Sequence, residues 1–361
     1  MIKKAIFPGC YLQGKDILKN LGGLTDLKNK KLFILATNSA VNNIIPENIS
    51  FWKSYCRIEY EKFNGECTWE EINRVLTIAK ANEYDFIMGL GGGKVIDTAR
   101  VVANKLNVNY IAAPTIAATD APTASACVVY DNNGTIVDYF TTSNPNYVLV
   151  DTCVIAQAPV RFLVSGMGDA MATWFEAETC DRSQFKNISG GFNLKAIMAI
   201  AHLCYQTLLE YGLEAKISCE NNLVTPALEY IIEANTLMSG LGFESGGLST
   251  AHGIHDCLCN LEDTHGYYHG EKVAFGMFAG LFLENRPLAV IQEVHNFNNS
   301  VGLPTTLAEI GLEKVTDRQL NEAVYGVFKN KDSYLHNIGI ELSPKHIIDA
   351  IRLADAFSLQ K

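Results

Sequence analysis

The sequence has no long apolar runs and no excess of basic residues. Its longest apolar runs, such as residues 274–283 (AFGMFAGLFL), extend for about ten residues, which suits a buried helix and is too short to cross a bilayer. Lysine and arginine together number 29 against 39 aspartates and glutamates, which gives a net charge of −10. Nucleic acid and membrane are therefore not expected partners, because phosphate binding needs a basic face.

Motifs that pair cysteines are also missing. The ten cysteines are scattered and form no CxxC pair, and residues 1–14 (MIKKAIFPGCYLQG) contain no apolar signal core. We therefore expect free thiols, a reducing compartment and a cytoplasmic protein. A hydrophobic content of 48% with 19% charged residues indicates a globular chain, and 361 residues are enough for two domains.

The two halves of the sequence have different patterns. Up to about residue 160, helical patterns at 70–81 and 94–106 alternate with short apolar runs that predict buried parallel strands. These runs are 32–35, 86–90, 109–114 and 147–151. The alternation predicts a doubly wound, parallel-sheet α/β domain over 1–160. Long helical patterns then predict an all-helical domain over 161–361, with the active site in the cleft between the two domains.

A glycine-rich loop follows one predicted strand and opens a helix. In residues 89–100 (GLGGGKVIDTAR), the three consecutive glycines allow backbone amides to approach a pyrophosphate, and the helix N-terminus adds partial positive charge. Lys94 adds a charge, and Asp97 in the first turn either complements the helix dipole or touches the ligand. The pattern is neither GxGxxG with a downstream acid nor a Walker A motif. A turn that uses glycine for geometry alone is the alternative.

A second loop of small residues follows the next predicted strand. Residues 113–126 (APTIAATDAPTASA) fit the rim of a nucleotide cleft. Asp120 in this loop has no basic neighbour in sequence, so its pattern suits the capping of a turn as well as a contact with substrate.

Histidine is scarce, yet half of the eight histidines fall within eighteen residues. They are His252, His255, His265 and His269. One carboxylate and two imidazoles, with a fourth position open, make a catalytic zinc site, and Asp169 near a predicted helix start offers the carboxylate. His252 and His255 are three apart on a helix face. The alternatives are that the aspartate caps its helix and that the histidines are ordinary core residues.

Five blocks of this sequence carry a family resemblance: TDAP (119–122), GMGDA (166–170), FESGG (243–247), AHGIH (251–255) and HGEKVAFG (269–276). With the sequence around them, they closely resemble glycerol dehydrogenases, which belong to the iron-type, group III superfamily of metal-dependent alcohol dehydrogenases. The resemblance extends over nearly the full length. It implies a homo-oligomer that acts on a small polyol.

The resemblance implies a metal ion held by Asp169, His252 and His269. Zn²⁺ is the expected ion, and Fe²⁺ or Mn²⁺ are alternatives for this ligand set. His255 is then expected beside the ligands, as a pocket residue that relays a proton. Asp120 matches the acidic residue that contacts the polyol.

The resemblance also implies NAD as the cofactor. The expected cofactor-binding positions are Thr37, Gly92, Gly93, Lys94, Asp97, Thr115, Ile116, Ala117, Ala118, Ala124, Ala126 and Tyr130.

Several of these positions depart from the family pattern. Thr37 stands where an acidic residue usually binds the adenosine ribose, so NADP stays open as an alternative. Ala124 and Ala126 replace a serine and a leucine. Asp256 follows His255 directly, and a neighbouring carboxylate is expected to raise the pKa of that imidazole.

The implied reaction is the reversible oxidation of glycerol to dihydroxyacetone, with hydride transfer to NAD. Zinc would act as a Lewis acid on the substrate hydroxyl, Asp120 would fix the substrate pose, and the proton would leave through water or His255. One alternative is a sister enzyme that acts on a hydroxycarboxylate, another diol or a hydroxyketone. The other is a cofactor-binding homologue that has lost its activity, which the altered second loop suggests.

Overall fold

The computed structural model describes residues 1–131 and 136–360, and the chain forms two compact units. The sheet unit comprises Phe7–Pro159 and Ser218–Gly240. The helical unit comprises Met1–Ile6, Val160–Ile217 and Leu241–Lys361. The sequence predicted a single division at residue 160. The structure differs in two segments. Met1–Ile6 belongs to the helical unit, and Ser218–Gly240 belongs to the sheet unit.

Hydrogen bonds explain both exchanges. In the sheet unit, the Asn235 side-chain amide donates to the Ala117 carbonyl at 3.0 Å, and the Thr123 hydroxyl donates to the Thr236 carbonyl at 2.8 Å. In the helical unit, the Lys4 amide donates to the Phe192 carbonyl at 3.1 Å. Such long-range contacts leave no local pattern in the sequence.

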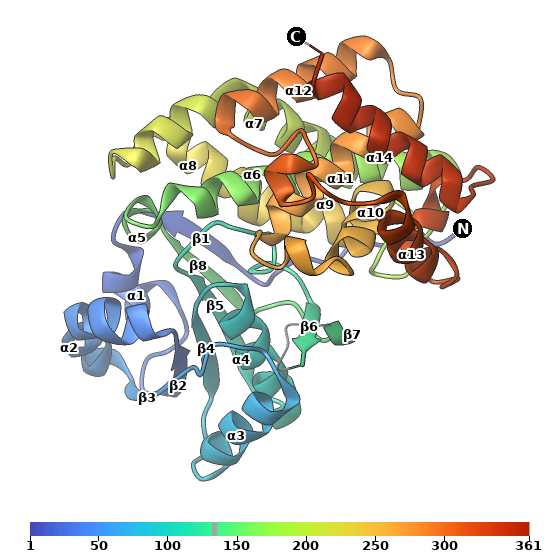
Figure 1. Ribbon diagram of the computed structural model, residues 1–361. Coiled ribbons are helices and arrows are strands. Elements are labelled where there is room, and N and C mark those ends of the chain that lie inside the picture. The colour runs from blue at the N-terminus through green and yellow to red at the C-terminus, as the bar shows by residue number, and fades with distance from the viewer. Residues whose placement is uncertain (132–135, 361) are drawn as a thin grey trace. The chain divides into compact units, whose positions relative to one another are not determined.

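The sheet unit is built on six parallel strands in the order β1-β8-β5-β4-β2-β3 (Figure 1). The strands are β1 (Tyr11–Gly14), β2 (Lys31–Ala36), β3 (Arg57–Lys62), β4 (Phe86–Gly91), β5 (Asn109–Pro114) and β8 (Tyr147–Asp151). The four predicted strands correspond to β2, β4, β5 and β8. The short β1 and the polar edge strand β3 were not predicted.

Helices cover both faces of this sheet, as expected for a doubly wound fold (Figure 1). Side chains of Ile34 and Met88 pack with Trp52 of the helix α2 (Ile45–Tyr55). Because side chains alternate along a strand, the residue next to Met88 on β4 faces the opposite side of the sheet. There Gly89 lies against Ala99 of α4 (Gly93–Leu106).

The described residues of this unit also form four further α-helices and two antiparallel strands. They are α1 (Leu21–Leu24), α3 (Trp69–Lys80), α5 (Thr152–Ala156), α8 (Pro226–Glu233) and the antiparallel pair β6 (Ala126–Tyr130) and β7 (Ile136–Thr141). The structure confirms the predicted helices at 70–81 and 94–106 as α3 and α4.

The helical unit is built almost entirely from helices, as the sequence predicted. Its helices are α6 (Val160–Ser183), α10 (Thr250–Cys259), α11 (His269–Leu283), α12 (Leu288–Val301), α13 (Asp317–Phe328) and α14 (Pro344–Ser358). Two further helices, α7 (Lys195–Glu220) and α9 (Ser239–Gly246), contribute most of their residues to this unit. Within residues 1–131 and 136–360, no helix is both long and apolar enough to span a membrane.

Candidate functional site

Three helices of the helical unit bring a carboxylate and two imidazoles together. Asp169 lies on α6, His252 on α10 and His269 is the first residue of α11. One ligand atom from each residue lies within 4.8 Å of the other two. The structure therefore gathers the three side chains that the family resemblance named as metal ligands.

Glycines next to two of these residues explain how α6 and α11 come so close. A Cβ on Gly168 would lie 2.4 Å from the carbonyl oxygen of Gly270, and a Cβ on Gly270 would lie 1.8 Å from that of Ser165. Side chains at either position would push the helices apart. The absence of a Cβ thus lets Asp169 and His269, the neighbours of these glycines, face one another.

A third glycine joins α10 to α11 in the same way. A Cβ on Gly276 would lie 2.6 Å from the carbonyl oxygen of Ala251. His252 directly follows this contact, so the close packing holds its backbone beside α11.

The Asp169 carboxylate is buried without a conventional donor. It is 2% exposed, and neither of its oxygens accepts a hydrogen bond from a donor in the described part of the chain. The His269 and His252 Nε2 atoms lie 3.3 and 3.6 Å from its Oδ1, beyond the usual range for such a bond. Ligand atoms about 2.0–2.2 Å from a tetrahedral ion lie about 3.3–3.6 Å apart. The spacing and the orphaned oxygens therefore fit a metal ion.

The electrostatics of the cluster agree with this fit. Burial raises the pKa of Asp169, but the charge of His269 and the contacts with His252 outweigh it and hold that pKa below its usual range. Burial lowers the pKa of His252, but the carboxylates of Glu176 and Asp169 outweigh it and raise that pKa well above the usual value. Both shifts indicate that the cluster favours positive charge beside the buried Asp169 carboxylate, which a metal cation would also supply.

Sequence reasoning missed one residue of this centre, Glu176. Its Oε2 lies 2.6 Å from His252 Nδ1, and its Oε1 accepts hydrogen bonds from the amides of Ser249 and His252 at 2.8 and 3.0 Å. Glu176 follows Asp169 by seven residues on α6, which places both on one face of the helix. That spacing was the available signal.

His255 lies beside the ligands, and both of its ring nitrogens have neighbours. Nδ1 lies 3.1 Å from Asp256 Oδ1, and Nε2 lies 3.0 Å from His269 Nδ1 and 3.3 Å from Cys259 Sγ. Burial lowers the pKa of His255 to about 3, with a further decrease from His269. Asp256 raises this pKa, as predicted, but burial and His269 outweigh the carboxylate.

In the sheet unit, the predicted cofactor residues gather at the carboxyl ends of three adjacent strands. Thr37 follows β2, Gly91 ends β4 and Thr115 follows β5. The Thr115 amide donates to the Gly91 carbonyl at 3.1 Å, and a Cβ on Gly91 would lie 2.4 Å from Thr37 Cγ2. The chain reverses its direction across the sheet between β2 and β4, and nucleotides bind at such switch points.

The start of α4 presents its backbone at this place. Gly92 is the N-cap residue, and no side chain caps the helix there. Lys94 is half exposed, pairs with Glu66 at 2.5 Å and lies 5.2 Å from the ring centre of Tyr130. Uncapped amides, a lysine and an aromatic ring are suited to an anionic, partly aromatic ligand.

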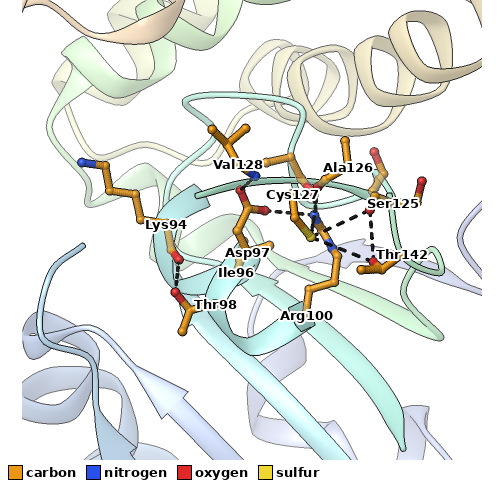
Figure 2. A network of polar contacts seen from close by, with 12 residues as sticks. Lys94, Ile96, Asp97, Thr98, Arg100, Ser125, Ala126, Cys127, Val128 and Thr142 are labelled. Carbon is orange, nitrogen blue, oxygen red and sulfur yellow. Dashed lines mark hydrogen bonds and ion pairs between the residues drawn. The ribbon is translucent and has the colours of Figure 1, made fainter. Parts of the chain in front are cut away.

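Asp97 has a different environment from the one predicted for it. Figure 2 shows its carboxylate between Arg100 and the strand β6. It pairs with the Arg100 guanidinium at 2.9 Å and accepts from the Val128 amide at 3.3 Å. Burial raises the pKa of Asp97 to about 6 against the opposing effect of Arg100. Both oxygens are engaged within the protein, so this placement does not favour its predicted contact with the cofactor.

Arg100, a second residue that sequence reasoning missed, continues this network. It is 1% exposed, and its guanidinium donates to the carbonyls of Ala121 and Ala126. The Ala121 carbonyl belongs to the loop that carries Asp120, and the Ala126 carbonyl belongs to β6, the strand that follows it. Its position three residues after Asp97 was the signal for the pair.

The Asp120 carboxylate is held by a serine of the same unit. Its Oδ2 accepts a hydrogen bond from the Ser239 hydroxyl at 2.9 Å, and its carbonyl accepts from the Thr123 amide at 3.3 Å. The structure therefore gives Asp120 a fixed pose in addition to its role in a turn.

The other predicted cofactor residues lie along the same loop. A Cβ on Gly92 would lie 3.0 Å from Ile116 Cδ1, and a Cβ on Gly93 would lie 3.7 Å from the Thr119 hydroxyl. Ala117 and Ala124 are buried. The last two are Ala118, which lies within the loop, and Ala126, which begins β6.

Comparisons with known proteins agree with this architecture. The sequence profile of the iron-containing alcohol dehydrogenases matches residues 8–152. The chain is 46% identical to a glycerol dehydrogenase of Thermotoga maritima, over 99% of this chain and 98% of that protein. It is 41% identical to a glycerol dehydrogenase of Escherichia coli, over 97% and 96% of the two chains.

A solved structure gives the same result. The crystal structure of a probable glycerol dehydrogenase from Sinorhizobium meliloti matches with a TM-score of 0.92 and 40% identity, over 99% of both chains. From these full-length matches, the chain belongs to the glycerol dehydrogenase family of iron-containing alcohol dehydrogenases.

Proposed function

We propose that this protein is a metal-dependent polyol dehydrogenase that reversibly oxidises glycerol to dihydroxyacetone and transfers the hydride to NAD. The observation that carries the proposal is the buried Asp169 carboxylate. It has two imidazole nitrogens 3.3 and 3.6 Å away and no conventional donor among the residues that the structure describes. The full-length relatives named glycerol dehydrogenase support the choice of substrate.

The metal would be held by Asp169, His252 and His269. A mixed oxygen and imidazole set accepts Zn²⁺, Fe²⁺ or Mn²⁺, and we propose Zn²⁺ because three protein ligands with one open position form its usual catalytic site. When bound, the ion supplies Lewis-acid stabilisation of negative charge on the substrate oxygen.

NAD would occupy the carboxyl end of the parallel sheet. The glycines before α4 allow its pyrophosphate to approach the uncapped amides of the helix, and the cofactor supplies the hydride acceptor when bound. Thr37 carries no charge at the end of β2, so it offers neither the acid that binds a ribose diol nor a base for a 2′-phosphate. NADP is therefore part of the test below.

Asp120 would orient the substrate. Its carboxylate is held by Ser239, so it can accept a hydrogen bond from a polyol hydroxyl without first ordering its own side chain. Both nitrogens of His255 have neighbours within the protein, which favours water over His255 as the first acceptor of the hydroxyl proton.

We further propose a homo-oligomer in the cytoplasm, as in the sequence-based expectation. All ten cysteines lie in the described residues and are free, which supports a reducing compartment.

The test is a steady-state assay of the zinc-loaded protein. Glycerol, propane-1,2-diol and dihydroxyacetone are each combined with NAD(H) and with NADP(H). We expect turnover of glycerol and dihydroxyacetone with a preference for NAD(H). Tight NAD binding without turnover of any of the three would contradict the proposal and support a homologue without activity. Turnover of a hydroxycarboxylate in preference to glycerol would support a sister enzyme.

A further inference from the structure

Glu176 contacts one of the three candidate metal ligands and is not itself a member of that group. It lies on α6 two turns after Asp169, and its carboxylate reaches across to His252 on α10. The side chain is 1% exposed. A buried carboxylate beside an imidazole in this way forms a chain from carboxylate to histidine to metal site.

The three contacts of Glu176 determine which nitrogen of His252 carries the proton. Its Oε1 already accepts from the amides of Ser249 and His252. Its Oε2 lies 2.6 Å from His252 Nδ1, and a carboxylate can only accept, so the proton must sit on Nδ1. When the ring is neutral, as metal ligation requires, its lone pair is then on Nε2, the atom 3.6 Å from Asp169 Oδ1.

We propose that Glu176 is a positioning residue that fixes the tautomer and ring orientation of His252 and thereby sets the affinity of the metal centre. The inference rests on the metal site of the proposed function. The second imidazole has a different support, because His269 Nδ1 lies 3.0 Å from His255 Nε2. Glu176 therefore supports a ligand ring through a direct carboxylate contact on the Nδ1 side, and its removal should affect metal binding strongly.

A purely structural role is the competing explanation. Glu176 accepts two amides at the start of α10, where the Ser249 side chain forms no cap. Loss of these bonds would destabilise α10, whether or not a metal binds.

Two substitutions separate the roles. In Glu176→Gln, the amide oxygen can keep the two backbone bonds, but the NH₂ group then faces His252 Nδ1 and favours the tautomer with its proton on Nε2. That tautomer cannot bind a metal through Nε2. In Glu176→Ala, the backbone bonds are lost, but the ring is free to adopt either tautomer.

The experiment measures Zn²⁺ affinity by competition with a chromophoric chelator and thermal unfolding of the metal-free protein, for wild type and both variants. We expect Glu176→Gln to weaken Zn²⁺ binding about 10- to 100-fold with a small change in Tm. We expect Glu176→Ala to show the larger decrease in Tm and the smaller loss of affinity. Glu178→Gln is the matched control, because Glu178 lies on the same helix and pairs with Arg286.

Two results would overturn the inference. One is that the Glu176→Gln variant binds Zn²⁺ as tightly as the wild-type protein does. The other is a loss of affinity that follows the loss of stability, with Glu176→Ala worse in both. If the wild-type protein itself bound no Zn²⁺, both the proposed function and the inference would be wrong. If the wild type bound Zn²⁺ and the variants gave either result above, only the inference would be wrong, so the two failures are distinguishable.

Discussion

Two buried aspartates, one in each unit, differ in what neutralises them. Asp97 in the sheet unit is 7% exposed, pairs with Arg100 at 2.9 Å and accepts from a backbone amide. Asp169 in the helical unit is 2% exposed, and its nearest ring nitrogens lie 3.3 and 3.6 Å away. The first carboxylate has conventional hydrogen-bond donors, whereas the second has none among the described residues and is incomplete in that sense.

This difference teaches that burial alone does not identify a ligand. Removing a charge from water is unfavourable for both residues, so each needs a compensating partner. Asp97 has a cation within the chain and holds a loop in place. Asp169 faces two imidazole nitrogens at a spacing that suits a shared metal ion, which is the arrangement of a metal site. The partners of a buried carboxylate therefore separate the structural from the functional residue.

The largest expected effect is on the incomplete carboxylate. Asp169→Asn should abolish stoichiometric zinc binding and polyol oxidation, because the amide removes the negative ligand. The metal-free variant should be less stable than metal-free wild type at neutral pH, because it loses the interactions with His269 and His252 that hold the Asp169 pKa below its usual range. Elemental analysis and urea unfolding check both parts. A normal zinc content in the variant would refute the ligand assignment.

Arg100→Met should reduce the stability of the protein without reducing its zinc content. Breaking a buried ion pair costs about 3–5 kcal/mol in the free energy of unfolding, and zinc content should not change. Without Arg100, the folded-state pKa of Asp97, already raised to about 6, should rise further. A raised carboxyl pKa reduces stability as pH increases from the unfolded-state value of about 4.

The destabilisation by Arg100→Met should therefore grow between pH 5 and pH 8. Urea unfolding of metal-free wild type and variant at both pH values measures this growth, and Arg100→Lys, which keeps the charge, should show less of it. An equal destabilisation at both pH values would contradict a charge pairing with Asp97.

Zinc should stabilise the wild-type protein by a smaller amount. At a free concentration 100 times its Kd, it adds about 2.7 kcal/mol to the free energy of unfolding. Removal with a chelator should lower Tm and re-addition should restore it. Asp169→Asn is the control and should show no response. A response of equal size in that variant would place the stabilising ion elsewhere.

The smallest effect is expected for substitution of Ser239, whose hydroxyl donates a hydrogen bond to the Asp120 carboxylate. Ser239→Ala removes one hydrogen bond to a carboxylate, worth about 1.5 kcal/mol, so KM for glycerol should rise about tenfold while the Kd of NAD stays the same. Ser239→Thr keeps the hydroxyl and should retain more of the affinity. Unchanged KM in the alanine variant would show that Ser239 does not position Asp120.

Much of the fold was predictable from local sequence. The buried runs of β2, β4, β5 and β8 are apolar at nearly every position, since helices cover both faces of the sheet. The edge strand β3, RIEYEK, is largely exposed, so it lacks that signal. The docking of Ser218–Gly240 on the sheet unit depends on tertiary hydrogen bonds and has no local pattern.

The candidate site was predictable to a similar degree. Ligand types and the glycine loop are visible as residues, and the family resemblance selected Asp169, His252 and His269 among them. The roles of Asp97 and Glu176 depend on what each carboxylate meets in three dimensions. Each had a helical spacing that indicated a shared face, but spacing does not reveal the partner on a distant segment.

The central claim is that Asp169, His252 and His269 hold one divalent cation. Anomalous diffraction at the zinc absorption edge, from crystals of the zinc-loaded protein, tests it most directly. The account predicts one strong peak about 2.0–2.2 Å from a carboxylate oxygen of Asp169 and from the Nε2 atoms of both histidines. No peak there, or a peak bound instead by His255 and Cys259, would contradict it.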